Sequence, residues 1–151
     1  MRKIVNALIV SAALIGAGMA FPASADDAAY NAALQDIEQT LGFVPTFMRQ
    51  MPKAGCAGAW QQLKGLEFSE DTALDAKTKA LIELAVVSQI PCQYCIWADA
   101  AAAKAAGATD EEIAEAVTMA ALTRHWSTFF HGMQVDFEQF KMELGGEMAA
   151  Q

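Results

Sequence analysis

Helix-forming residues dominate the chain from residue 26 onward, where Ala, Leu, Glu, Gln, Lys and Met recur throughout. No segment shows the sustained alternation of apolar and polar residues that is typical of a strand. Apolar residues instead recur at helical spacing between breaks made by Gly and Pro, as in the run Tyr30, Leu34, Ile37 and Leu41, which Gly42 ends. The sequence therefore predicts an all-α, multihelical domain.

The first 25 residues contain the three parts of a secretory signal in the usual order. Two basic residues come first, residues 4–21 are mostly apolar, and Ala23, Ser24 and Ala25 offer the small-x-small pattern that a signal peptidase accepts. The segment is short of the ~20 strongly apolar residues that a membrane anchor needs. We therefore expect cleavage after Ala25 and a periplasmic or secreted protein.

Residues 26–151, which remain after cleavage, have the length of a single domain with one core. This part keeps eight basic and all 18 acidic residues, so its net charge is −10. Its cations do not cluster, and we expect no nucleic acid partner and no membrane partner after cleavage. Because Ala-rich helices bury little area each, we also expect several copies to associate and complete the core as a homo-oligomer.

Caps and breaks predict where the individual helices begin and end. Asp75 is the expected cap of the helix that begins at about residue 76. Pro91 separates two of them, because the residue before a proline avoids helical geometry. Thr109 and Glu112 form a capping box, in which each side chain satisfies a free backbone amide of the other residue. The helices are expected at about residues 26–41, 52–65, 76–89, 91–106, 109–126 and 134–144, with a short turn or helix near 46–50.

Cys92 and Cys95 are three residues apart at the expected start of a helix. At this spacing their Cβ atoms lie roughly 5–6 Å apart, so a small local adjustment closes a disulfide. Cys92 falls in the first turn, where free amides and the helix dipole lower the pKa of a thiol, although access also decides which thiol attacks. In an oxidising compartment the pair rests as a disulfide unless it is reduced. The remaining Cys56 is interpreted as a small buried residue.

Other uses of a Cys-x-x-Cys pattern fit less well. A c-type haem site needs His directly after the second cysteine, where this chain has Ile96. Structural zinc needs two further ligands, which only folding could supply from His125, His131, Asp99 or Cys56. A thioredoxin-type motif needs a preceding strand. We predict no cofactor and no metal, and a bare structural disulfide stays an alternative, although a four-residue loop constrains the unfolded chain very little.

Glu83 lies on a helix that is apolar on nearly every face, among Leu81, Ile82, Leu84, Ala85, Val86, Val87 and Ile90. A carboxylate in such surroundings is either paired or has a raised pKa. One interpretation is a surface carboxylate or an ion pair, with Lys79 or Arg124 as partner. The other is a general base that takes a thiol proton directly or through water. Both interpretations stay open.

These features together resemble the carboxymuconolactone decarboxylase and alkyl hydroperoxidase D-like (AhpD-like) family. The resemblance covers about residues 74–121 and is carried by three runs, Leu81-Ile82-Glu83-Leu84-Ala85, Pro91-Cys92-Gln93-Tyr94-Cys95-Ile96 and Gly107-Ala108-Thr109-Asp110-Glu111-Glu112-Ile113. It implies an all-helical oligomer, commonly a trimer or hexamer. It also implies that Cys92 and Cys95 cycle between dithiol and disulfide while reducing a small peroxide, or a disulfide in a protein or small molecule.

The resemblance also implies roles for single residues, with two departures. Glu83 is the implied proton acceptor, although the family Glu often lies about one turn earlier, where this chain has Ala80. In the family the second cysteine usually reacts with the peroxide, whereas the helix dipole favours Cys92 as the more acidic thiol. Which of the two cysteines reacts first therefore stays open. Asp99 stands where the family has a histidine.

Asp99 changes the charge near the cysteine pair. It lies one turn after Cys95 on the same face, where its carboxylate repels a thiolate and raises the thiol pKa. Glu83 and Asp99 could share one proton, which would keep one of them neutral. Alternatively His125 fills the role of the missing histidine from another helix, or it is an ordinary helix-end or core residue.

The sequence thus predicts a thiol/disulfide oxidoreductase whose candidate catalytic residues are Cys92, Cys95, Glu83, Asp99 and His125. Two alternatives stay open. One is a lyase of the decarboxylase branch that acts on a small lactone acid without cysteine chemistry, for which Arg124 and Arg49 are the obvious cationic anchors of the anionic substrate. The other is a non-catalytic oligomeric module with a structural disulfide.

Overall fold

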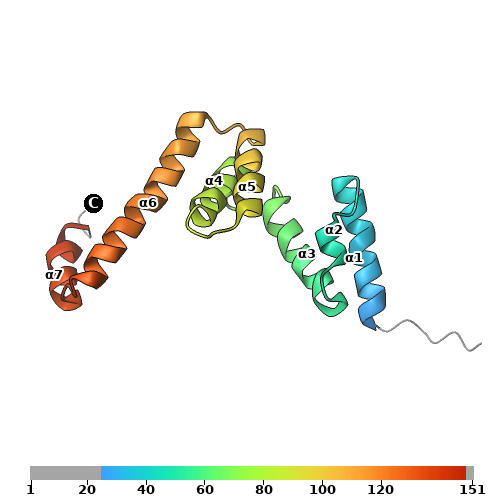
Figure 1. The fold of residues 1–151 in the computed structure, drawn as a ribbon, viewed down its shortest axis with the longest axis horizontal. Helices are drawn as coiled ribbons and strands as arrows, with labels where there is room; N and C mark the ends of the chain where they lie inside the picture. Colours follow the sequence, from blue (N-terminus) through green and yellow to red (C-terminus); the bar gives the residue numbers. More distant parts are fainter. Residues whose placement is uncertain (1–24, 149–151) are drawn as a thin grey trace, which may run out of the picture. The chain divides into compact units, whose positions relative to one another are not determined.

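The structure of the protein is a computed structural model that describes residues 25–148 (Figure 1). These residues form seven helices and no strand, which confirms the predicted all-α fold. The predicted signal lies outside the described residues except for Ala25. Within the described part, no helix has the length and apolar character needed to cross a membrane. The chain divides into two compact units after Trp60, and the single domain over 26–151 stays a prediction.

The first unit holds α1 (Ala25–Leu41), α2 (Thr46–Arg49) and the first half of α3 (Lys53–Glu67). Trp60 is fully buried and its Nε1 donates a hydrogen bond of 2.7 Å to the Asp36 carboxylate. Cys56 is buried as a free thiol, which confirms its interpretation as a core residue. The small core of this unit consists of Ala33, Ile37, Met48, Cys56 and Trp60.

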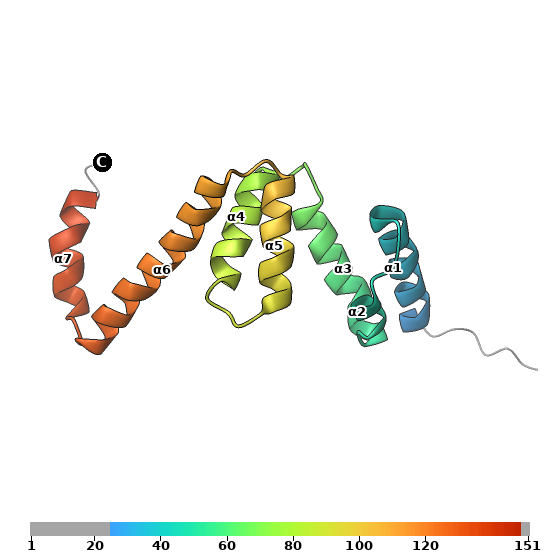
Figure 2. The same cartoon turned by 45° about the horizontal axis from the view of Figure 1, so that its top comes forward.

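The second unit is built around α4 (Ala76–Val87), which packs against both α5 (Gln93–Ala105) and α6 (Asp110–Gly132). Figures 1 and 2 show α4 and α5 side by side and α7 (Phe137–Met148) after the end of α6. The buried residues described in this unit are Ala80, Leu84, Ala103 and Ala120. Three of the four are alanines, so the second unit buries little apolar area within one chain.

The predicted caps at the start of α4 and α6 are both present. The Asp75 carboxylate accepts a hydrogen bond of 2.8 Å from the Thr78 amide. The capping box is complete, because the Glu112 amide donates to Thr109 Oγ1 at 3.1 Å and the Thr109 amide donates to Glu112 Oε2 at 2.8 Å. Glu112 also forms an ion pair of 2.8 Å with Lys77. One side chain therefore caps α6 and ties its start to the start of α4.

Several predicted helix ends were wrong by two or more residues. α3 continues past Gly65 to Glu67, α5 begins at Gln93 rather than at residue 91, and α7 continues past Leu144 to Met148. α4 ends at Val87 rather than at residue 89, while α6 continues to Gly132, which is the first Gly or Pro after Gly107. α7 begins at Phe137 rather than at residue 134. The cause is Asp136, whose carboxylate accepts a hydrogen bond of 2.8 Å from the Gln139 amide and caps the helix there. Gln134 lies in the turn before it, with a φ of +50°.

Replacing the cap residue of α6 tests this account of its start. We expect Thr109→Ala to lower the free energy of unfolding by ~1 kcal/mol, because the Glu112 amide loses its acceptor. Urea unfolding followed by circular dichroism, at one fixed protein concentration, measures the change. Thr118→Ala is the matched control, since Thr118 lies in the interior of α6 and alanine favours a helix there. Equal losses in the two variants would contradict the cap.

Candidate functional site

A disulfide joins Cys92 and Cys95, whose Cα atoms are 5.4 Å apart. Cys92 occupies the N-cap of α5 and so lies directly before the first turn, in which it had been predicted to lie. Its sulfur accepts a hydrogen bond of 3.3 Å from the Cys95 amide. An anionic sulfur in this place would be stabilised by the same amide and by the helix dipole. The start of α5 therefore provides the environment that lowers the pKa of a thiol at position 92.

The two sulfurs lie in different surroundings. Cys92 lines an open hollow together with Pro91, Gln93, Tyr94 and Ile96. Tyr94 and Trp97 are each 77% exposed, so the outer side of this turn is an accessible aromatic surface. Cys95 lies instead on the stripe of α5 that turns toward α4 and continues through Asp99 to the buried Ala103. Both cysteines are half-buried, and Cys92 is the one of the two that lines this open hollow.

Glu83 of α4 and Asp99 of α5 come together where the two helices pack. Burial raises the pKa of the Glu83 carboxyl, and the nearby Asp99 charge raises it further, while Lys79 opposes the shift. Burial also raises the pKa of Asp99. Since Asp99 lies one turn after Cys95, two carboxyl groups whose pKa is raised lie on the Cys95 side of the disulfide.

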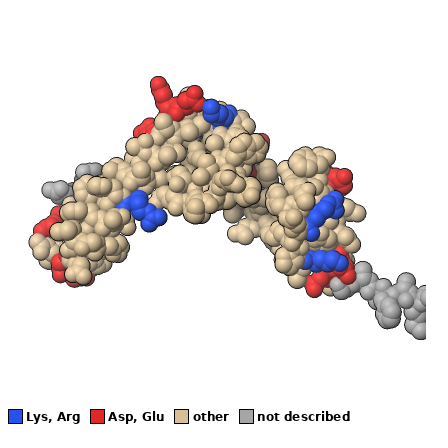
Figure 3. Space-filling model, in the orientation of Figure 1, with Lys and Arg blue, Asp and Glu red and all other residues tan. Residues whose placement is uncertain are grey.

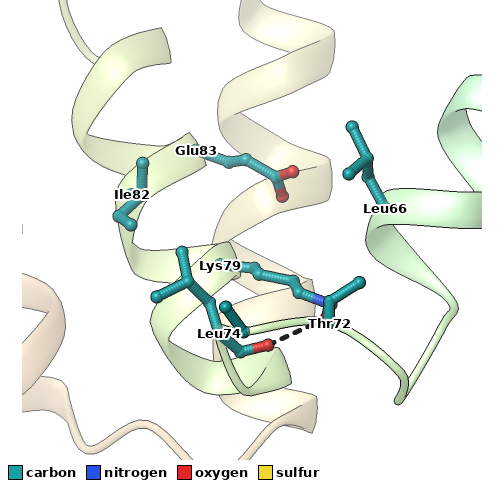
Figure 4. A pocket seen from close by; sticks show the side chains of 7 residues that line it. Leu66, Thr72, Leu74, Lys79, Ile82 and Glu83 are labelled. Atoms are coloured by element: carbon teal, nitrogen blue, oxygen red, sulfur yellow. Dashed lines mark hydrogen bonds between the residues drawn. The ribbon is translucent and has the colours of Figure 1, made fainter.

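Lys79 does not form the ion pair considered for Glu83. Its Nζ donates a hydrogen bond of 3.0 Å to the Ser69 carbonyl. Figure 4 shows the Glu83 carboxylate extending from α4 toward Leu66, above the Lys79 side chain. These residues border a hollow that is otherwise mostly apolar, formed by Leu66, Thr72, Ala73, Leu74, Lys79, Ile82 and Glu83. No ion pair to Arg124 is present among residues 25–148 either.

Glu67 is a third carboxylate at this place, and the sequence analysis missed it. It is the last residue of α3, and its pKa is raised first by burial and then by the charges of Glu83 and Asp99. Its position follows from how the end of α3 approaches α4 and α5. No local pattern in the sequence signals that approach.

His125 lies in a different environment. It is exposed on α6, and its ring packs edge-on against Trp126 with centroids 5.3 Å apart. Figures 1 and 2 both show the second half of α6 running away from α4 and α5. The structure brings Cys92, Cys95, Glu83 and Asp99 together but does not bring His125 to them within one chain. Across the described ranges, no group of three or more His, Cys, Asp or Glu side chains could hold a metal ion.

Comparison with known proteins shows the family of this chain. The sequence model of the carboxymuconolactone decarboxylase family matches residues 55–136, more than half of the chain. The chain belongs to the carboxymuconolactone decarboxylase family. The matched region contains the disulfide, the three carboxylates and all of α6. The resemblance seen in the sequence is therefore confirmed.

Two individual proteins are similar to this family member. The crystal structure of the alkylhydroperoxidase AhpD core from Rhodospirillum rubrum is 30% identical and superposes with a TM-score of 0.63, over 75% of this chain and 86% of that one. Uncharacterized protein 4 in the cox locus of Paracoccus denitrificans is 41% identical over 61 residues, 40% of this chain. That match spans 55% of the curated relative, about half of its length. The structural likeness confirms the AhpD-like fold.

The raised pKa of Glu83 predicts how stability depends on pH. A carboxyl whose pKa is higher in the folded chain binds more protons when folded, so its contribution is most favourable below the ordinary value of 4.5 and is lost as pH rises through the raised value. We expect Glu83→Gln to be more stable than the native chain at pH 7, with the difference disappearing near pH 4. Urea unfolding across this pH range measures it. Glu70→Gln, in the exposed linker, is the control, and a less stable Glu83→Gln at pH 7 would show that an ion pair holds Glu83 instead.

Proposed function

We propose that this protein is a thiol/disulfide oxidoreductase in which Cys92 and Cys95 alternate between disulfide and dithiol. The observation that carries the proposal is the disulfide at the N-cap of α5, open to solvent on the Cys92 side and next to carboxyl groups of raised pKa on the Cys95 side. Its substrate is a small peroxide or a disulfide. Export after cleavage at Ala25, to the periplasm or beyond, is part of the same proposal.

The chemistry moves two electrons out of the dithiol. With a peroxide, one thiolate attacks an oxygen, the O–O bond breaks, and a sulfenic acid and an alcohol or water form. The second thiol then attacks the sulfenic sulfur, which closes the Cys92–Cys95 disulfide and releases water. With a disulfide substrate, the first thiolate forms a mixed disulfide, and the second thiol displaces the reduced substrate.

The environment of each sulfur supports a different role for each cysteine in the reaction. The amide hydrogen bond and the open hollow favour Cys92 as the thiolate that meets a bulky disulfide. Cys95 faces the carboxylates, which disfavour its anion but can accept its proton when it resolves the intermediate. A carboxyl with a raised pKa is closer to a thiol pKa, so the proton transfer is less unfavourable. We assign this acceptor role to Glu83, with Asp99 sharing the proton.

The two rival functions have weaker support. A lyase acting on a lactone acid needs cations around its substrate, whereas this site gathers Glu67, Glu83 and Asp99, and the nearby Lys79 bonds a backbone carbonyl. A purely structural disulfide would span only a four-residue loop and so contribute little stability. Neither alternative function gives a role to the carboxylates beside the cysteine pair.

Replacing the cysteines tests the function directly. We expect Cys92→Ser and Cys95→Ser each to abolish the reduction of hydrogen peroxide, tert-butyl hydroperoxide and a model protein disulfide, and Cys56→Ala to keep most of it. A reduction potential above about −300 mV is expected for the native pair. A far lower potential, with both thiols inert after forced reduction, would indicate a structural bond. Turnover of a lactone acid by the Cys92→Ser, Cys95→Ser double variant would indicate the lyase.

The charge at position 99 gives a separate prediction. Because a like charge disfavours a thiolate, Asp99→Asn should shift the pH profile of Cys95 alkylation to lower pH. The rate of reaction with iodoacetamide, measured against pH in a Cys92→Ser, Cys56→Ala background, reports the shift. Asp71→Asn, in the exposed linker before α4, is the matched control. An unchanged profile in Asp99→Asn would remove Asp99 from the site.

A further inference from the structure

The end of α3 is held against α4 beside Glu83. Lys79 Nζ donates a hydrogen bond of 3.0 Å to the carbonyl of Ser69, which follows shortly after α3. Because Lys79 and Glu83 are four residues apart, they lie on the same face of α4. Leu66 borders the same hollow as both of them, as Figure 4 shows. Glu67, the last residue of α3, therefore lies in the chain between two residues that approach this face of α4.

The charge of Glu67 interacts with the two carboxylates already placed in the candidate site. Burial raises the pKa of Glu67, and the negative charges of Glu83 and Asp99 raise it further. Electrostatic repulsion is mutual, so a charge on Glu67 also disfavours a charge on Glu83, and the carboxyl groups titrate as a coupled set. The dipole of α3 adds to this effect, because the last turn of a helix carries partial negative charge on its free carbonyls. A carboxyl at this place therefore binds a proton more readily than one in water.

The other charged groups around α4 act elsewhere. α6, which also packs on α4, contributes Glu112, and its carboxylate pairs with Lys77 at 2.8 Å. Figure 3 shows acidic and basic side chains gathered together where α6 begins. Lys77 is six residues before Glu83, or ~9 Å along the helix at 1.5 Å per residue. Lys64, one turn before Glu67 on α3, lines a different hollow. The charges that act on Glu83 therefore come from the end of α3, from α5 and from Lys79 of its own helix.

We propose that Glu67 is a positioning residue of the candidate site, whose negative charge makes Glu83 a stronger proton acceptor. This role rests on the proposed redox function. When the Cys95 thiol attacks a sulfenic sulfur at Cys92, its proton passes to Glu83 and the S–S bond forms as the S–O bond breaks. The leaving hydroxide takes the proton back from Glu83 and becomes water. Glu67 acts on this step only through Glu83, because a base with higher proton affinity removes the thiol proton more readily.

Carbon-13 NMR of the glutamate carboxyl groups in the oxidised protein tests the proposal without any turnover, and Glu83→Gln identifies the Glu83 signal. In about 20 mM salt, where charges act over long distances, Glu67→Gln should move the titration midpoint of Glu83 to lower pH. Because Glu67 is exposed, salt screens its charge, so the shift should shrink in about 1 M salt, where the Debye length is about 3 Å. Glu67→Asp keeps the charge and should retain most of the native midpoint.

A matched substitution and two opposite outcomes decide the result. Glu70→Gln removes the same charge from the exposed linker after α3 and should move the Glu83 midpoint far less. A Glu83 midpoint that Glu67→Gln leaves in place at low salt overturns the proposal. A shift of equal size at both salt concentrations overturns it too, because a structural change rather than a charge would then be the cause. Circular dichroism checks that each variant retains its helices.

The rate of disulfide closure gives a second readout. In a Cys56→Ala background, the loss of free thiol after addition of hydrogen peroxide is followed against pH. Its pH profile should shift to lower pH in Glu67→Gln, in the same direction as the Glu83 titration. A profile that stays in place while the Glu83 signal moves overturns the role of Glu67 in the reaction. A failure of the proposed redox function would leave the NMR titration unchanged, so the two proposals fail separately.

Discussion

The packing of α4 on α5 is the interaction on which the candidate site depends. α4 is apolar on nearly every face, so it can contact α5 on one side and α6 on another. The single carboxylate that interrupts its last two turns, Glu83, then lies against α5 near Asp99, while the same face of α5 carries Cys95 one turn earlier. A shift of one residue in this packing would turn Glu83 away from Asp99. The acidic groups and the disulfide are therefore positioned by the same apolar contact.

The electrostatic asymmetry of the cysteine pair follows from its place at a helix start. The amide at residue 95 points at the Cys92 sulfur, which favours negative charge there. Asp99 lies one turn after Cys95 on the same helix, with Glu83 of α4 near it, and these carboxylates oppose negative charge at Cys95. With histidine in place of Asp99, the second sulfur would instead face an imidazole. The aspartate thus makes the two thiols more unequal, and it favours reactions in which the outer sulfur attacks and the inner one resolves.

Local signals allowed much of this structure to be predicted, and non-local packing explains what was missed. Asp75, Thr109 and Glu112 act within one turn of their own helix, so their caps could be read from the sequence. The proximity of Cys92 and Cys95 is equally local. Glu67 could not be found in this way, because its effect on Glu83 depends on where the end of α3 lies relative to α4. The start of α7 was predicted too early because the apolar Val135 was counted as part of the helix. In the structure the Asp136 carboxylate caps the helix, which therefore begins at Phe137.

The small core of the second unit determines how the candidate site is held in place within one chain. Ala80, Ala103 and Ala120 let the three helices approach closely but bury little area, and Leu84 is the one large side chain buried with them in the described part of this unit. The larger apolar groups of α6 face outward. Within one chain, α6 is held to α4 by the Lys77–Glu112 ion pair and by the packing between the two helices. The position of α4, and with it that of Glu83, therefore depends on the close approach of helices lined by small residues rather than on a large buried apolar area.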